Sequence, residues 1–94
     1  MISTHVLDTE SGRPAVAVRV ELFRGEELLA AGETDAEGRI RELGDPGPGT
    51  YRLVFHPATV FFSRVEVEVA LTESRHYHVP LLLSPYQCTI YRGS

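Results

Sequence analysis

Hydrophobic and polar residues alternate one by one along most of the chain, with the period of a β-strand. The clearest run is residues 16–23, in which Val16, Val18, Val20 and Leu22 alternate with Ala17, Arg19, Glu21 and Phe23. Residues 64–71 repeat the pattern, with Glu66 and Glu68 between apolar positions. Because successive side chains of a strand point to opposite faces, each run predicts a strand with one buried face and one solvated face.

Weaker forms of the same alternation predict six further strands, at residues 2–7, 28–34, 39–43, 51–56, 76–83 and 88–93. Turn residues separate the strands, most clearly at residues 44–49, where glycine and proline alternate. Ala30 and Ala31 would also suit a helix, which leaves a helical alternative for that segment. Eight short strands at near-regular spacing predict an all-β fold, a two-sheet antiparallel β-sandwich formed by one domain of residues 1–94.

Composition narrows the classes of partner. A formal net charge of −4 argues against nucleic acid or an anionic membrane as the main partner, because both bind basic surfaces. No apolar run is long enough to span a membrane, and residues 1–5 lack the pattern of a secretory signal. The single cysteine, Cys88, suits a reducing compartment, so we expect a cytoplasmic location, with the peroxisome as alternative. A chain of 94 residues buries a modest share of its surface, which favours self-association.

Residues 76–94 gather side chains that can carry chemistry. They include two of the four histidines, two of the four tyrosines and the only cysteine. His76 and His78 are two positions apart, so a strand places both imidazoles on one face. The final strand has two faces, one formed by Thr89, Tyr91 and Gly93 and the other by Cys88, Ile90 and Arg92. We expect Cys88 to face the core, which makes a cysteine nucleophile the weaker interpretation.

Three blocks of sequence carry a recognisable pattern. In chain order they are Ser3-Thr4-His5-Val6-Leu7-Asp8 with Gly12-Arg13-Pro14, then Thr34-Asp35-Ala36-Glu37-Gly38-Arg39, and finally His76-Tyr77-His78-Val79-Pro80 through Tyr86 with Tyr91-Arg92-Gly93-Ser94. Together they resemble the transthyretin-related 5-hydroxyisourate hydrolases, whose signature ends in His-Tyr-His-x-Pro-x-Leu-x-Ser-(Pro/Gln)-Tyr and then Tyr-Arg-Gly-Ser. Residues 56–64 are shorter than the family's usual insert, so we expect its short helix to be shortened or absent.

The resemblance implies a fold, an assembly and a reaction. The family fold is two four-stranded sheets packed face to face, assembled as a homotetramer with sites at a subunit interface and without metal or other cofactor. The reaction is the hydrolysis of 5-hydroxyisourate at a lactam carbonyl to 2-oxo-4-hydroxy-4-carboxy-5-ureidoimidazoline, a step of urate degradation. By position, the implied catalytic residues are His5, Arg39, His78 and Ser94, and the implied substrate-binding residues are the same four with Tyr91 and Arg92.

These residue types suit the hydrolysis of a cyclic amide, which needs a base for water, a donor for the developing oxyanion and an acid for the leaving nitrogen. His5 and His78 suit the first and third roles, because histidine has an ordinary pKa of about 6.5. Arg39 suits the second, and Ser94 with Tyr91 orients water or substrate. Which histidine is the base, and whether Ser94 acts through its hydroxyl or its terminal carboxylate, stays open. Replacing His5, Arg39 or His78 by alanine is expected to abolish turnover in a folded protein.

Other interpretations compete with this hypothesis. His5, His76 and His78 form an alternative three-histidine zinc site, since histidines on one strand face can bind one ion. A carrier of transthyretin type, which binds small aromatic ligands without turnover, is the alternative function, although such carriers lack these histidines and the Tyr-Arg-Gly-Ser ending. A non-catalytic interaction module is a third class. Phe61 and Phe62 are expected to cover a sheet edge or an interface.

Overall fold

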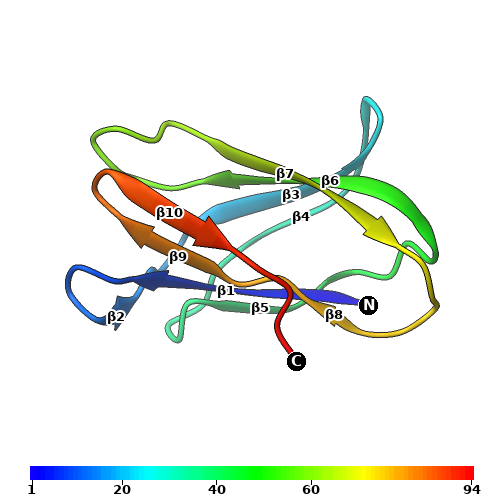
Figure 1. Ribbon diagram of the computed structural model, residues 1–94, viewed down its shortest axis with the longest axis horizontal. Coiled ribbons are helices and arrows are strands. Elements are labelled where there is room, and N and C mark those ends of the chain that lie inside the picture. Colours follow the sequence, from blue (N-terminus) through cyan, green and yellow to red (C-terminus); the bar gives the residue numbers. More distant parts are fainter.

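Two β-sheets face each other and form the whole molecule (Figure 1). The computed structural model describes residues 1–94, with overall dimensions of 35 × 25 × 19 Å. Its ten strands are β1 (Ile2–Asp8), β2 (Arg13–Pro14), β3 (Arg19–Arg24), β4 (Glu27–Glu33), β5 (Arg39–Gly44), β6 (Gly49–His56), β7 (Val65–Leu71), β8 (Tyr77–His78), β9 (Leu81–Ser84) and β10 (Gln87–Ile90). The all-β sandwich is confirmed, and so is the absence of the short helix. Nothing in the chain forms a helix of the length and hydropathy that crossing a membrane requires.

The smaller sheet has four antiparallel strands in the order β4-β3-β6-β7. Leu22 of β3 lies opposite Leu53 of β6, which in turn lies opposite Val67 of β7, so one apolar row crosses the inner face. The outer face carries ion pairs, among them Arg52–Glu66. This sheet contributes one wall of the core and none of the predicted site residues.

The larger sheet has β1 at its centre and carries the predicted site. β5 and β2 pair with β1 in antiparallel fashion, whereas β8 and β9 pair with it in parallel, and β10 follows β9 at the edge. The prediction of eight strands in antiparallel sheets, and the four-plus-four arrangement implied by the resemblance, are therefore wrong in detail. The predicted strand at residues 76–83 is divided at Val79 and Pro80, because proline lacks the N–H that a ladder needs.

The strand predicted over residues 16–23 begins only at Arg19. Val16 and Ala17 form a turn in which Ala17 has a positive φ of 61°, and Val16 is 58% exposed. Thr34 stabilises this turn: its carbonyl accepts from the Ala17 N–H at 2.9 Å, and its hydroxyl accepts from the Val18 N–H at 2.9 Å. The alternation of residue types did not reveal that Thr34 accepts hydrogen bonds from these backbone N–H groups and so favours a turn over a strand.

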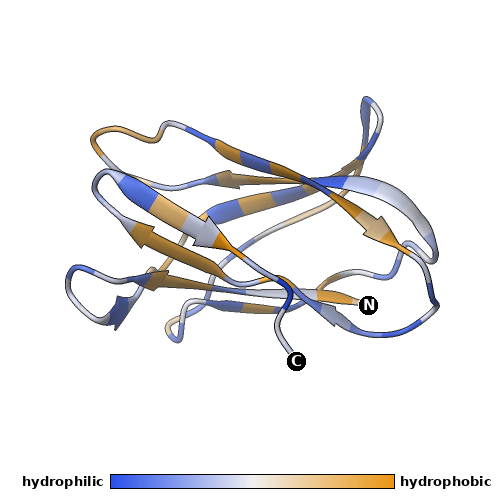
Figure 2. Ribbon diagram, in the orientation of Figure 1, coloured by the Kyte–Doolittle hydropathy of each residue, from blue (hydrophilic) through white to orange (hydrophobic).

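Alternate residues of both sheets form the core between them, and several strands in Figure 2 alternate accordingly between hydrophobic and hydrophilic residues. The fully buried apolar side chains are Ile2, Val6, Val20, Leu22, Leu53, Phe55 and Leu81. Cys88 packs against this core from β10, which confirms its predicted orientation. Phe62 also packs against the core, whereas Phe61 is 66% exposed. The packed core thus supports β1 and its neighbours from the inner side of the larger sheet.

Candidate functional site

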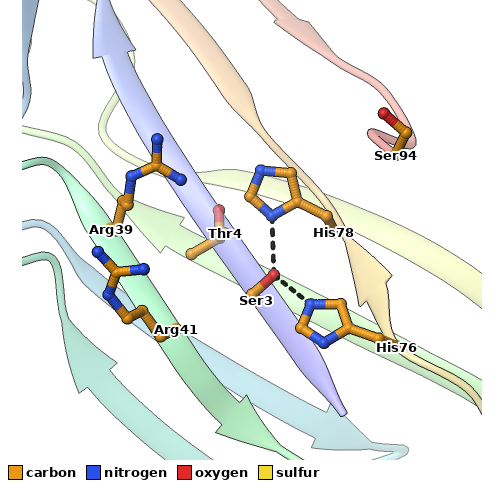
Figure 3. A pocket seen from close by; sticks show the side chains of 7 residues that line it. All are labelled: Ser3, Thr4, Arg39, Arg41, His76, His78 and Ser94. Carbon is orange, nitrogen blue, oxygen red and sulfur yellow. Dashed lines mark hydrogen bonds between the residues drawn. The ribbon is translucent and has the colours of Figure 1, made fainter.

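A polar depression of about 250 Å³ opens on the outer face of the larger sheet. The seven residues that line it are Ser3, Thr4, Arg39, Arg41, His76, His78 and Ser94, all of them polar or charged (Figure 3). Its volume lies just below the range of about 300–1,000 Å³ typical of sites for drug-sized ligands. The depression therefore suits a small polar molecule.

Strand pairing explains why residues far apart in the sequence meet here. His5 on β1 is the partner of Arg39 on β5, and Ser3 on β1 is the partner of His78 on β8. Partners in a sheet point to the same side. Ile2, Thr4 and Val6 face the core, so Ser3 and His5 face outwards with Arg39 and His78. The central position of β1 thus places a guanidinium and imidazoles side by side.

The turn before β5 fixes the position of Arg39. The Asp35 carboxylate accepts hydrogen bonds from the N–H groups of Glu37 and Arg39, at 2.8 and 2.9 Å, and the bond from Arg39 is the main cause that lowers the pKa of Asp35. Gly38 has a φ of 76°, and its carbonyl accepts from the Val6 N–H at 2.8 Å. The turn is thereby attached to β1, and Arg39 enters β5 directly beside His5.

The imidazole of His78 has one nitrogen occupied and one exposed to the depression. Nδ1 lies 2.7 Å from the hydroxyl oxygen of Ser3, and Nε2 points towards Arg39 in Figure 3. Burial is the main cause that lowers the pKa of His78, and electrostatic repulsion from Arg39, and to a smaller extent from the His5 and His76 side chains, lowers it further. This environment therefore favours the neutral imidazole of His78, the form that a general base needs.

His5 lies on the same face but does not line the depression within one chain. Its Nε2 is 2.9 Å from the carbonyl oxygen of Glu37. A carbonyl only accepts hydrogen bonds, so Nε2 carries the proton and Nδ1 is the nitrogen that can act as a base. The roles implied for His5 stay predictions, now attached to a particular ring nitrogen.

Ser94 borders the depression beyond His78, opposite to Arg39 (Figure 3). Gly93 places it there, because the Gly93 N–H donates to the His78 carbonyl at 2.7 Å in an isolated bridge. A Cβ at position 93 would lie 2.8 Å from Cδ2 of the His78 ring and 3.3 Å from Cγ of Pro80. Only glycine lets the backbone approach this closely.

Tyr91 and Arg92 lie outside the polar depression. They border a separate apolar hollow, at the edge between the two sheets, together with residues of β7 and with Tyr77. The Arg92 guanidinium lies 5.6 Å from the centre of the Tyr77 ring, a cation–π contact. A substrate-binding role for these two residues stays a prediction that one chain by itself does not support.

The zinc alternative finds no ligand set in this geometry. The structure has no group of three histidine, cysteine, aspartate or glutamate side chains that could hold a metal ion. His76 and His78 converge as predicted, but they converge on the hydroxyl of Ser3, which lies 2.7 Å from a ring nitrogen of each. The structure thus corrects the hypothesis that these histidines share an ion.

Sequence reasoning missed Ser3, Thr4 and Arg41 as lining residues and considered His76 only for zinc. The signal was available in part, because Ser3 has the parity of His5 on one strand and Arg41 has the parity of Arg39 on another. Arg41 and Arg39 also share an ion-pair partner, because the Glu37 carboxylate lies 3.7 Å from the Arg41 guanidinium and 3.8 Å from the Arg39 guanidinium.

Comparisons with known proteins identify similar chains over their full length. The sequence profile of the HIUase/Transthyretin family matches residues 2–93. The 5-hydroxyisourate hydrolase 2 of Rhizobium meliloti is 38% identical, over 99% of this chain and 95% of the relative. The solved structure of Klebsiella pneumoniae 5-hydroxyisourate hydrolase is 35% identical with a TM-score of 0.88, covering 99% of this chain and 97% of the other. Sea bream transthyretin in complex with thyroxine is 28% identical with a TM-score of 0.85, covering 98% of this chain and 93% of the other.

Proposed function

The chain belongs to the HIUase/Transthyretin family, and from this membership and the chemistry of its polar depression we propose that it is a 5-hydroxyisourate hydrolase. The enzyme adds water to a lactam carbonyl of the substrate and opens the six-membered ring. The product is 2-oxo-4-hydroxy-4-carboxy-5-ureidoimidazoline. As part of the same proposal, the reaction is a step of purine metabolism, in urate degradation after urate oxidation.

The observation that carries the proposal is the position of the partly buried His78 imidazole beside the Arg39 guanidinium in one depression, where burial lowers the pKa of His78. His78 Nε2 takes a proton from water as the water oxygen bonds to the carbonyl carbon. The carbonyl electron pair moves to oxygen, and Arg39 stabilises the negative charge that develops there. The proton then passes to the leaving nitrogen as the C–N bond breaks. His5 and Ser94 orient the substrate and the water.

The carrier alternative requires a different lining. The depression that holds the candidate residues contains no hydrophobic side chain, whereas sites for small ligands are mostly apolar with a few polar groups. Of the polar depression and the apolar hollow beside Tyr91, only the hollow has the apolar lining that a carrier of aromatic ligands needs. Neither His5 nor His78 lines that hollow. The polar depression therefore favours hydrolysis over passive binding.

A homotetramer with its sites at a subunit interface completes the proposal. On the outer face next to the site, Leu7 of β1 and Leu82 of β9 are direct partners and only half-buried. Apolar side chains beside a polar site favour contact with a second copy, which would also exclude water from His78. A cytoplasmic location is part of the same proposal, supported by the free thiol of Cys88.

One assay tests the reaction directly. 5-Hydroxyisourate is generated from urate in situ, and its ultraviolet decay is followed with and without the protein. We expect faster decay with the wild-type protein, and a loss of about 100-fold or more in Arg39→Ala and His78→Ala. His56→Ala is the matched control, because His56 bonds to Glu21 on the other sheet. Decay at the spontaneous rate in the presence of assembled wild-type protein would instead support the carrier.

A further inference from the structure

The hydroxyl of Ser3 lies between two imidazoles. Its oxygen is 2.7 Å from Nδ1 of His78 and 2.7 Å from Nε2 of His76 (Figure 3). Ser3 is only 7% exposed and His78 is half-buried, whereas His76 is exposed. The three side chains therefore form one hydrogen-bonded line that leads from the polar depression to solvent.

Because Ser3 has one hydroxyl proton and each neutral imidazole has one N–H, the hydrogen bonds of this line can be arranged in only two ways. A hydroxyl donates one hydrogen bond, so Ser3 donates to one imidazole and accepts an N–H from the other. If Ser3 accepts from His78, both histidines carry their proton on Nδ1 and His78 Nε2 is free to act as a base. If Ser3 donates to His78, both histidines carry their proton on Nε2 and His78 is an acid at the same atom. The two tautomers are thus coupled.

We propose that Ser3 and His76 form a proton relay that carries the charge of His78 to solvent during hydrolysis. The inference rests on the proposed function. When His78 Nε2 has taken a proton from water, its Nδ1 proton passes to the Ser3 oxygen, and the proton of Ser3 passes to His76 Nε2. His76 then releases its own Nδ1 proton to solvent. One proton enters the line and one leaves it, and His78 is left neutral with its proton on Nε2.

The reverse passage resets the line. His78 gives its Nε2 proton to the leaving nitrogen while Nδ1 receives the proton of Ser3. Ser3 takes the Nε2 proton of His76, and His76 takes a proton from solvent at Nδ1. His78 thereby acts first as base and then as acid without holding a positive charge beside Arg39.

The charges around His78 support such a relay. Arg39 from β5, His5 from β1 and His76 before β8 all oppose a positive charge on His78. Arg41 adds a further positive group to the wall of the depression. His76, by contrast, is exposed, so solvent screens a charge that reaches it. Ser3 and His76 are accordingly positioning residues, since they act through His78.

The kinetic test separates the relay from structural support. In His76→Gln the amide still bonds to Ser3 but accepts no proton, so we expect kcat to fall by about tenfold or more with KM within about twofold. Added imidazole is expected to restore kcat in this variant and to leave the wild-type protein unaffected. Ser3→Ala is expected to lose activity that Ser3→Thr largely regains, and His56→Gln is the control. A wild-type kcat in His76→Gln would overturn the relay while leaving the hydrolase proposal intact.

A second test needs no substrate. Nitrogen-15 NMR at about pH 8, above the ordinary pKa of histidine, reports which ring nitrogen of His76 and of His78 carries the proton. We expect His76 and His78 to have the same tautomer in the wild-type protein and to lose this match in Ser3→Ala. One histidine protonated on Nδ1 and the other on Nε2 would overturn the inference, whether or not the protein hydrolyses 5-hydroxyisourate.

Discussion

At the scale of single residues, the environment of His78 decides which form of its imidazole is present at pH 7. Burial disfavours the imidazolium, and the guanidinium of Arg39 is the largest charged contribution in the same direction. The neutral base therefore persists to lower pH than in free histidine, and it is lost only when the pH falls below the lowered pKa.

The contribution of Arg39 can be measured separately. In Arg39→Gln a positive neighbour is removed, so the imidazolium is less disfavoured and the pKa of His78 is expected to rise towards its ordinary value. NMR titration of the His78 ring checks this without substrate. Arg24→Gln is the control, because Arg24 pairs with Glu27 on the other sheet. A fall of the pKa in Arg39→Gln would contradict the stated cause.

The glycine beside His78 gives a second prediction at this scale. In Gly93→Ala the added methyl lies 2.8 Å from the His78 ring, which Ser3 holds in place, so ring or backbone must move. A displacement of about 1 Å costs on the order of 100-fold in rate, so we expect a large fall in kcat with little change in the melting temperature. In Gly32→Ala the new Cβ meets Ile40 at an ordinary 3.6 Å, and activity should be retained. Equal kcat in both variants would show that the contact is unimportant.

At the scale of elements, the turn between β4 and β5 connects the fold to the site. Asp35 accepts from two backbone N–H groups, and Gly38 places its carbonyl against β1. The same residues thus determine the turn, the start of β5 and the position of Arg39.

Alanine substitutions at two glycines with positive φ distinguish the cost of backbone strain from the cost of disturbing the contact between this turn and β1. Gly25→Ala, at φ 58°, meets nothing within 4 Å and is expected to lose about 1 kcal/mol in the free energy of unfolding. Gly38→Ala, at φ 76°, places a Cβ 2.5 Å from the Val6 carbonyl oxygen, so we expect a loss of about 3 kcal/mol or more. Urea denaturation measures both. Similar losses would mean that the turn moves away from β1 at little cost.

The sequence predicted where the strands lie in the chain better than it predicted which strands pair with each other. Alternation located the elements and the face on which His5, His76 and His78 lie, because it depends on the backbone alone. It could not supply the parallel pairing of β8 and β9 with β1, which joins Ser3 to His78 across 75 positions. The sequence therefore revealed the histidines that can carry chemistry but not the Ser3 hydroxyl that links His76 to His78.

At the scale of the whole molecule, several strands have a free edge, among them β7 and β10. β7 ends the smaller sheet and β10 ends the larger one, so each has backbone groups available for pairing with another chain. The half-buried leucine pair Leu7 and Leu82 adds an apolar surface on the outer face. These features support self-association around the site.

Disrupting the apolar surface tests this assembly. In Leu82→Asp a charge replaces the half-buried leucine beside Leu7, so we expect the proposed tetramer to dissociate, with a fall in activity of about tenfold or more. Sedimentation and the ultraviolet assay measure the two effects. Leu28→Asp is the control, because Leu28 is 48% exposed on β4 of the other sheet. A fully active monomer would contradict a site that depends on assembly.

The central place of β1 also constrains how the molecule folds. β1 is synthesised first, yet its parallel partners β8 and β9 begin some 75 positions later in the chain. Contacts between segments so distant in sequence slow folding, because a long loop must close before they form. On the ribosome, the larger sheet therefore stays incomplete until residues 77–84 have emerged. Until then β1 can pair with β2 and β5 but not with β8 and β9, and the depression lacks His78 and Ser94.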